Sequence, residues 1–216
     1  MTGLRRHRWI HVRADAREAV AGQCRDEASG QAVRRCLALG WPLVARARAT
    51  GDRADFHPAG LCLPLAEGRR RIATEVHPAQ VAGVEEPAPL EVVAGVLPPQ
   101  ARAVAHELAA LARTLGFTAR AFGSAAWQWR TGEAYLTPAS DLDLLAPARA
   151  AGLARWLEHL AAHEARSPLR LDGEIEDETG DAVNWREWVA APASVLVKSP
   201  AGARLVARAA LAEAWR

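Results

Sequence analysis

Two aspartates alternate with leucines in residues 140–145, which read SDLDLL. Successive side chains of a strand point to opposite faces, so Asp141 and Asp143 are expected on one face and the leucines on the other. Two neighbouring carboxylates in an apolar strand are costly unless a cation lies between them. The spacing therefore indicates a cation site, whereas the ordinary alternative for an Asp-x-Asp sequence is a solvated sheet edge.

A second acidic pair follows the same rule in residues 169–175, which read LRLDGEI. Asp172 and Glu174 are expected to share one face of that strand. If the two acidic strands are neighbours, three or four carboxylates converge. Oxygen ligands at this density suit Mg²⁺, which binds a few carboxylates together with substrate phosphates. The absence of His and Cys from the set argues against zinc.

Gly123 and Ser124 precede these acids and offer a complementary phosphate site. Glycine lets the backbone approach a phosphate closely, and serine adds a hydroxyl donor. A Gly-Ser pair on its own is usually only a turn. Placed before an Asp-x-Asp strand and a further acidic strand, the pair predicts a triphosphate held against a bound metal.

The bulk composition is that of a folded protein, with 216 residues, 50% hydrophobic and 24% charged. No signal-peptide pattern and no apolar run of membrane-spanning length are present, so we expect a cytoplasmic protein without a membrane partner. The three cysteines match no metal or CxxC spacing, and we interpret them as small buried hydrophobes.

The charge is distributed unevenly along the chain. Residues 1–71 carry 14 basic and 7 acidic side chains, and residues 72–216 carry 13 and 18. This asymmetry favours an anionic partner for the first part of the chain. An arginine-rich composition spread over a solvated surface is the alternative explanation.

Prolines around residues 85–98 exclude a long helix there and predict a domain boundary. We expect a β-rich domain in residues 1–90, with one helix near residues 17–39. Residues 97–216 are expected to form a mixed sheet with helices, so the predicted fold class is α/β (α+β).

The second domain has readable element signals. Pro98 and Pro99 open a helix that ends before Gly116. Another helix is expected to open at Pro147, and a last one closes the chain. Strands are expected at residues 118–122, 140–145, 169–175, 182–189 and 194–198.

The order of Gly-Ser, Asp-x-Asp and a later acidic strand resembles the nucleotidyltransferase superfamily of DNA polymerase β-like proteins. Several longer segments resemble one family, the malonate decarboxylase holo-acyl-carrier-protein synthases, also called phosphoribosyl-dephospho-CoA transferases. They are FGSAAWQWRTGEAYLTPASDLDLL, RLDGEIEDETGDAVNWREW and VLVKS, with WPLVARAR and LCLPLAEGRRRIA in the first domain.

The resemblance implies a nucleotidyltransferase-like catalytic domain and a defined reaction. The enzyme would transfer 2′-(5″-phosphoribosyl)-3′-dephospho-CoA from its triphosphate precursor to a serine of the acyl carrier protein subunit of malonate decarboxylase, releasing diphosphate. Mg²⁺ would be held by Asp141, Asp143 and a third carboxylate, either Asp172 or Glu174, of which we favour Asp172. Asp172 or Glu174 would also assist deprotonation of the serine.

Three further residues are candidates for substrate binding. Lys198 is the only lysine of the chain and follows an apolar segment, which suggests a phosphate contact, whereas a chance surface lysine is the alternative. Trp127 is placed to stack on adenine or to cover the pantetheine arm, unless it belongs to the core. Arg186, expected on a strand, reaches phosphate or pairs with Glu174, and we favour the ion pair.

Two other functions remain compatible with the sequence. One is a different Mg²⁺-dependent nucleotidyltransferase that modifies a small molecule or a nucleic acid, although we do not expect a nucleic-acid partner. The other is a non-catalytic adaptor that binds the carrier protein and whose acids form only a charged surface. Loss of transfer on mutation of Asp141 or Asp143 would separate an enzyme from an adaptor.

Overall fold

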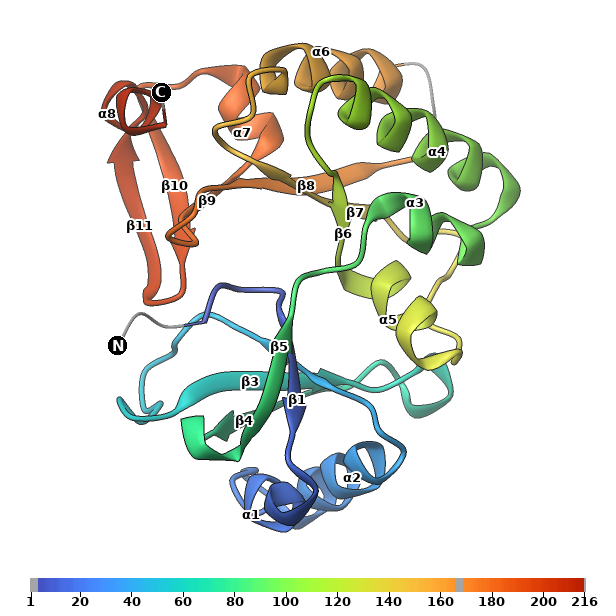
Figure 1. Ribbon diagram of the computed structural model, residues 1–216, viewed down its shortest axis with the longest axis vertical. Coiled ribbons are helices and arrows are strands. Elements are labelled where there is room, and N and C mark those ends of the chain that lie inside the picture. The colour runs from blue at the N-terminus through green and yellow to red at the C-terminus, as the bar shows by residue number, and fades with distance from the viewer. Residues whose placement is uncertain (1–3, 166–168, 216) are drawn as a thin grey trace. The chain divides into compact units, whose positions relative to one another are not determined.

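The computed structural model describes residues 4–165 and 169–215. The chain forms two compact units, and the predicted mixed α/β fold class is confirmed. One unit comprises the chain up to Pro87 together with Pro200–Gly202, and the other comprises Ala88–Ser199 and the chain from Ala203 onward. Each unit contains its own sheet, and the two are described separately below (Figure 1).

The first unit is built on a five-stranded antiparallel sheet with strand order β4-β3-β2-β1-β5. The strands are β1 (Trp9–Val12), β2 (Leu43–Ala45), β3 (His57–Cys62), β4 (Arg71–Val76) and β5 (Val81–Glu85). The helices are α1 (Arg17–Ala21) and α2 (Glu27–Ala38), with short 3₁₀ turns η1 (Ala14–Ala16), η2 (Leu65–Glu67) and η3 (Pro78–Gln80).

The single helix expected near residues 17–39 is two helices. The chain leaves α1 at Gly22, and Asp26 then caps α2 by accepting a hydrogen bond from the Ser29 amide at 2.8 Å. An aspartate cap satisfies one of the free amides of a first helical turn, so it marks a new helix start inside what reads as one amphipathic run. The hydroxyl of Thr74 in β4 donates to the carbonyl of Val20 in α1 and ties that helix to the sheet.

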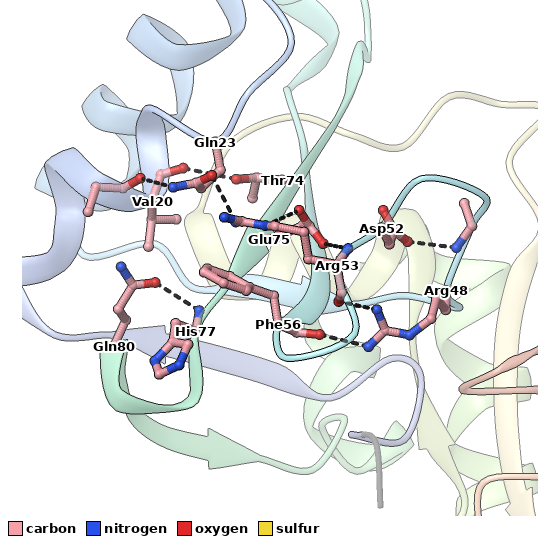
Figure 2. Close-up of polar contacts among 12 residues, drawn as sticks. Val20, Gln23, Arg48, Asp52, Arg53, Phe56, Thr74, Glu75, His77 and Gln80 are labelled. Carbon is pink, nitrogen blue, oxygen red and sulfur yellow. Dashed lines mark hydrogen bonds and ion pairs between the residues drawn. The ribbon is translucent and has the colours of Figure 1, made fainter. Parts of the chain in front are cut away.

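The connection between β2 and β3 is held by arginine side chains (Figure 2). The guanidinium of Arg48 donates to the carbonyls of Arg53 and Phe56. Arg53 in turn donates to Glu75 of β4 through its amide at 2.7 Å and its Nε at 3.0 Å, and its guanidinium lies over the Phe56 ring. These contacts satisfy loop carbonyls that no strand pairs, which gives the loop a defined shape.

The second unit contains a six-stranded sheet with strand order β11-β10-β9-β8-β7-β6. The strands are β6 (Arg120–Ala121), β7 (Leu142–Pro147), β8 (Leu171–Glu176), β9 (Ala182–Asn184), β10 (Ser194–Ser199) and β11 (Gly202–Ala207). The helices are α3 (Leu90–Val93), η4 (Ala94–Val96), α4 (Pro99–Thr114), α5 (Gly123–Thr131), α6 (Leu153–Glu164), α7 (Trp185–Ala190) and α8 (Arg208–Ala214).

The apolar face of this sheet forms the core of the unit. Leu142 and Leu144 of β7 are buried together with Ile175 of β8, and helices α4 and α6 lie over them (Figure 1). The indole of Trp156 in α6 donates to the carbonyl of Leu108 in α4 at 3.2 Å. The alternation read from the sequence therefore assigns the leucines to the core and leaves the acids on the opposite face.

In the second unit, several element predictions are confirmed, and one helix start and one strand end are wrong. The helix begins at Pro99 as expected, and Gly116 after its end has a φ of 84°. The helix expected to open at Pro147 instead begins at Leu153, because Pro147 is the last residue of β7. The strand expected over residues 182–189 ends at Asn184, where the helix α7 starts.

Within the described residues, no helix is long and apolar enough to cross a membrane.

Candidate active site

The acidic strands β7 and β8 are parallel neighbours, with Asp143 directly opposite Asp172. Directly opposed residues of paired strands project from the same sheet face. Because Leu142 and Leu144 face the core, Asp143 and Asp172 both lie on the other face. The condition that the sequence leaves open, that the two acidic strands are neighbours, is therefore met.

Gly123 lies directly against the carboxylate of Asp143. The amide of Phe122 donates to the backbone carbonyl of Asp143 at 3.1 Å, and Gly123 follows with a φ of 66°. A Cβ atom at residue 123 would lie 1.9 Å from Oδ2 of Asp143. Only glycine fits here, because both the left-handed backbone and the close approach exclude a side chain.

Gly123 and Ser124 form the first turn of a helix and not a simple turn. Helix α5 runs from Gly123 to Thr131 and ends at Gly132, which has a φ of 76°. The amides of a first helical turn lack partners within the helix, and the helix dipole adds partial positive charge at this end. Since the Asp143 carboxylate reaches Gly123, this positive helix end and the acidic face of the sheet meet at one place.

The carboxylate of Asp172 is held through a single oxygen. Its Oδ1 accepts hydrogen bonds from the amide of Gly173 at 2.9 Å, from Nδ2 of Asn184 at 2.9 Å and from Nη1 of Arg186 at 3.2 Å. No hydrogen bond reaches Oδ2 from any described residue, and the side chain is 39% exposed. Asn184 has no sequence signal for this role, because its position just before a tryptophan-rich segment predicts a strand.

Asp141 is placed differently from Asp143, the other acid of the Asp-x-Asp sequence. It precedes β7, and its Oδ1 lies 3.6 Å from Nε of the exposed Arg170. An exposed ion pair at this distance contributes little to stability and is easily broken. Asp141 therefore lies at the border of the acidic face, next to the paired strands and not within them.

Glu174 is occupied by an ion pair with Lys198. The two side chains approach to 3.1 Å between Nζ and Oε1, and the Glu174 side chain is only 5% exposed. The Lys198 side chain is 41% exposed, so its ammonium retains contact with solvent. Of the two candidates for a third metal carboxylate, Asp172 therefore has the freer oxygen.

The expected convergence of three or four carboxylates is not met. Among residues 4–165 and 169–215, no three His, Cys, Asp or Glu side chains form a group that could hold a metal ion. Neighbouring strands bring the acids into register, but the ion pair of Glu174 and the end position of Asp141 separate them. The central pair is Asp143 and Asp172.

Arg186 is on helix α7 and not on a strand, and its acidic partners are not the expected one. Its guanidinium binds Glu164 at the end of α6 and Asp172, and its Nη2 donates to the carbonyl of Leu171 at 2.7 Å. The hydrogen bond from Arg186 holds the pKa of Glu164 below its ordinary value. The prediction of an ion pair between Arg186 and Glu174 is therefore wrong, and Arg186 joins α6, α7 and β8.

The tryptophans are mainly structural. Trp127 is 5% exposed and stacks on Tyr135 with 6.0 Å between ring centroids. Trp185 is buried and its indole donates to the carbonyl of Leu171 at 2.8 Å, whereas Trp188 packs on Trp215. Both lie on α7 and not on the strand expected over residues 182–189. The burial of Trp127 favours its alternative assignment to the core.

The donor set fits a magnesium ion that also binds substrate phosphates. Mg²⁺ is commonly held by one or two carboxylates and completes its coordination with water and phosphate oxygens. Asp143 and Asp172 provide two such carboxylates in register, and the carboxylate of Asp143 lies directly against the backbone of Gly123. A closed cage of three or more protein ligands is not required for this mode of binding.

Paired acids on neighbouring strands beside a Gly-Ser helix start are the arrangement expected of a transferase of the nucleotidyl-transfer type. Comparison with protein families gives two adjoining matches. The phosphoribosyl-dephospho-CoA transferase MdcG N-terminal domain matches residues 5–87, and the C-terminal domain of the same family matches residues 88–209. The chain belongs to the phosphoribosyl-dephospho-CoA transferase MdcG family.

Curated relatives agree with this assignment over nearly the full chain. A phosphoribosyl-dephospho-CoA transferase of Xanthomonas euvesicatoria is 37% identical over 209 residues, which cover 95% of each chain. A second, from Bradyrhizobium diazoefficiens, is 35% identical over 90% of this chain and 86% of its own. A third, from Pseudomonas putida, is 34% identical over 83% and 80%. No solved structure matches this chain.

Proposed function

We propose that this chain transfers the phosphoribosyl-dephospho-CoA group from its triphosphate precursor to a serine of the malonate decarboxylase acyl carrier protein, with release of diphosphate. Family membership supports the activity. The observation that supports the location is the in-register pair Asp143 and Asp172, with Gly123 against the first of them. The same pair supports an enzyme over a non-catalytic adaptor whose acids form only a charged surface.

The reaction forms one bond and breaks one bond at the same phosphorus. The serine oxygen of the carrier protein bonds to the phosphorus that joins the ribosyl group to diphosphate, and the bond from that phosphorus to diphosphate breaks. Diphosphate leaves with the bonding electrons, and the serine proton passes to a base. Asp172 or Glu174 takes this proton, since both lie on the sheet face that carries Asp143.

Asp143 and Asp172 would hold Mg²⁺, with Asp141 at the edge of the set. When bound, the ion would supply positive charge beside the phosphate oxygens. Holding two reactants in line is itself a large source of acceleration in phosphoryl transfer. The contribution of this chain is therefore mainly positioning, without a covalent enzyme intermediate.

Gly123, Ser124 and Lys198 contact the phosphates. The first turn of α5 directs its amides toward an anion, and the Ser124 hydroxyl adds a donor. The Lys198 ammonium is partly exposed while paired with Glu174, which suits a cation shared between the sheet and a bound phosphate. Arg186 acts indirectly, since its hydrogen bonds are committed to Glu164, Asp172 and the Leu171 carbonyl.

The activity is tested by incubating the protein with the cognate carrier subunit, the triphosphoribosyl-dephospho-CoA precursor and Mg²⁺, and weighing the carrier. A mass increase equal to the transferred group is expected. Asp143→Asn and Asp172→Asn should each reduce the rate by at least about 100-fold, since each removes a charge at the phosphate. Far-ultraviolet circular dichroism and thermal unfolding establish that both variants remain folded.

Glu158→Gln is the matched control, because Glu158 is an exposed acid of the same unit on α6, away from the paired strands. It should transfer at the wild-type rate. An unmodified carrier would disprove the assigned reaction, and modification of a nucleotide or nucleic acid instead would identify a different nucleotidyltransferase. Undiminished transfer by Asp143→Asn would show that the acidic face is not the site.

A further inference from the structure

We infer that Asn184 is a positioning residue that sets which oxygen of Asp172 faces the metal and the substrate. Asn184 is the last residue of β9 and lies opposite Glu174 of β8, so its side chain projects from the acidic sheet face. Its amide nitrogen donates to Oδ1 of Asp172 at 2.9 Å. The inference rests on the proposed function, because it assigns a role within that site.

Both ends of the Asn184 amide are engaged, which fixes its orientation. Its Oδ1 accepts a hydrogen bond from the Arg186 amide at 2.9 Å and thereby caps helix α7. An asparagine amide has one accepting and one donating end. Since a backbone N–H must meet the oxygen, the nitrogen necessarily faces Asp172, and the reversed orientation would lose both hydrogen bonds.

The donors around Asp172 are all on one side. The amide of Gly173 and the side chains of Asn184 and Arg186 converge on Oδ1. Within the described part of the chain, Oδ2 accepts no hydrogen bond and is thus the oxygen open to a ligand. Of the two side-chain donors, Asn184 is the closer, at 2.9 Å against 3.2 Å for Arg186.

Loss of the Asn184 donor leaves only the Gly173 amide and Arg186 on Oδ1, so the carboxylate is held less firmly in its orientation. The Asp172 side chain projects from the sheet face that also carries Asp143, and Oδ1 is the oxygen that its three donors hold. Partners that orient a ligating carboxylate without touching the metal typically change metal affinity or activity by about 10–100-fold. The role is therefore positioning: Asn184 acts through Asp172 and does not contact the reacting atoms.

The test separates the donor function of Asn184 from its capping function. Asn184→Ser keeps an oxygen that can cap α7 but is too short to reach Asp172 as well, whereas Asn184→Ala loses both functions. Mn²⁺ alone serves as the probe, with free Mn²⁺ measured by electron paramagnetic resonance. We expect Asn184→Ser to bind Mn²⁺ about tenfold more weakly than wild type while unfolding at the wild-type temperature.

A kinetic readout accompanies the binding measurement. The Mg²⁺ concentration for half-maximal transfer should rise about tenfold in Asn184→Ser, with the rate largely recovered at saturating Mg²⁺. Asp26→Ala is the control, because it removes the cap of α2 in the other unit. That variant should lower the unfolding temperature and leave Mn²⁺ affinity unchanged.

The outcomes distinguish this inference from the proposed function. Wild-type Mn²⁺ affinity in Asn184→Ser, together with weakened binding in Asp172→Asn, would overturn the positioning role and leave the proposed site standing. Equal Mn²⁺ binding by wild type and Asp172→Asn would overturn both. If Asn184→Ser binds Mn²⁺ more weakly and also unfolds at a lower temperature, the positioning role would be rejected in favour of a structural role.

Discussion

At the scale of single residues, the proposed site depends on Gly123, which has no side chain, as much as on the acids. The Asp143 carboxylate occupies the space that a Cβ of residue 123 would fill. Gly123 therefore allows the acid and the first turn of α5 to meet. A motif search sees glycine as a flexible turn residue, whereas here its lack of a side chain sets the position of a proposed metal ligand.

Gly123→Ala should abolish transfer through displacement of Asp143. The added Cβ would lie 1.9 Å from Oδ2, so the carboxylate or α5 must shift. Displacements of about 1 Å in a reacting site cost about 100-fold in rate, and we expect at least that loss in the carrier-modification assay. Alanine in a left-handed conformation also costs about 1 kcal/mol of stability.

Gly132→Ala provides the matched control for this substitution. Gly132 ends the same helix with a similar φ of 76°, but nothing lies within 4 Å of an added Cβ. Urea unfolding should show at least as much destabilisation in Gly123→Ala as in Gly132→Ala, with full activity retained only by Gly132→Ala. Equal loss of activity in both would mean that backbone strain, and not the contact with Asp143, is responsible.

At the scale of elements, α7 connects the acidic face to the rest of the second unit. Asn184 begins the helix, and Arg186 in its first turn reaches Glu164 at the end of α6 and Asp172 on β8. The sequence predicted a strand here because Trp and Val favour strands. The asparagine cap outweighs that preference, since it satisfies amides that only a helix start leaves free.

The ion pair between Glu164 and Arg186 should make the free energy of unfolding depend on pH. The hydrogen bond from Arg186 lowers the pKa of Glu164 in the folded state from the ordinary value of 4.5. A lowered folded-state pKa contributes stability above the unfolded-state value, and this contribution is lost as the pH falls through the folded-state pKa. Wild type should therefore lose more stability than Glu164→Gln between pH 6 and about pH 3.5.

Urea unfolding at several pH values measures this difference. Glu158→Gln on the same helix is the control, since Glu158 is exposed and has no ion-pair partner among the described residues. Its stability should follow the wild-type curve. Parallel curves for wild type and Glu164→Gln would show that the pair with Arg186 adds no stability.

At the scale of the whole molecule, the sequence predicted the class and order of elements better than their ends. Alternating leucines and aspartates have one consistent placement, so the common face of the acids within each strand could be foreseen, whereas the parallel pairing of β7 with β8 was left open. The lack of a four-acid cluster among the described residues could not be foreseen, because it depends on the ion pair of Glu174 with Lys198 and on where β7 begins. Such details follow from tertiary contacts.

Other misses have similar causes. The Gly-Ser pair was read as a turn because glycine disfavours helices, but at a first helical position that cost is small. Strands β5 and β11 lack a clear pattern because most of their residues are at least partly exposed. Asn184 was missed because its function depends on a partner 12 residues away, which single-sequence spacing does not specify.

The three cysteines should be unreactive in the folded protein. All three are free thiols, and burial raises the pKa of each, that of Cys36 from 9.0 to about 11. At pH 8 this lowers the thiolate fraction of Cys36 by about 100-fold. Reaction with a chromogenic disulfide reagent should accordingly be slow in buffer, with three thiols reacting rapidly in guanidinium chloride. Rapid labelling of Cys36 in buffer would contradict the burial described.

Lys198 has a practical consequence for handling the protein. Because it is the chain's single lysine and 41% of its side chain is exposed, succinimidyl dyes, biotin esters and amine-coupled sensor surfaces have one side-chain target, apart from the terminal amine. Lys198 is hydrogen-bonded to Glu174 on the acidic sheet face. Immobilisation through a tag or a thiol introduced elsewhere would avoid attaching the probe at the proposed phosphate site.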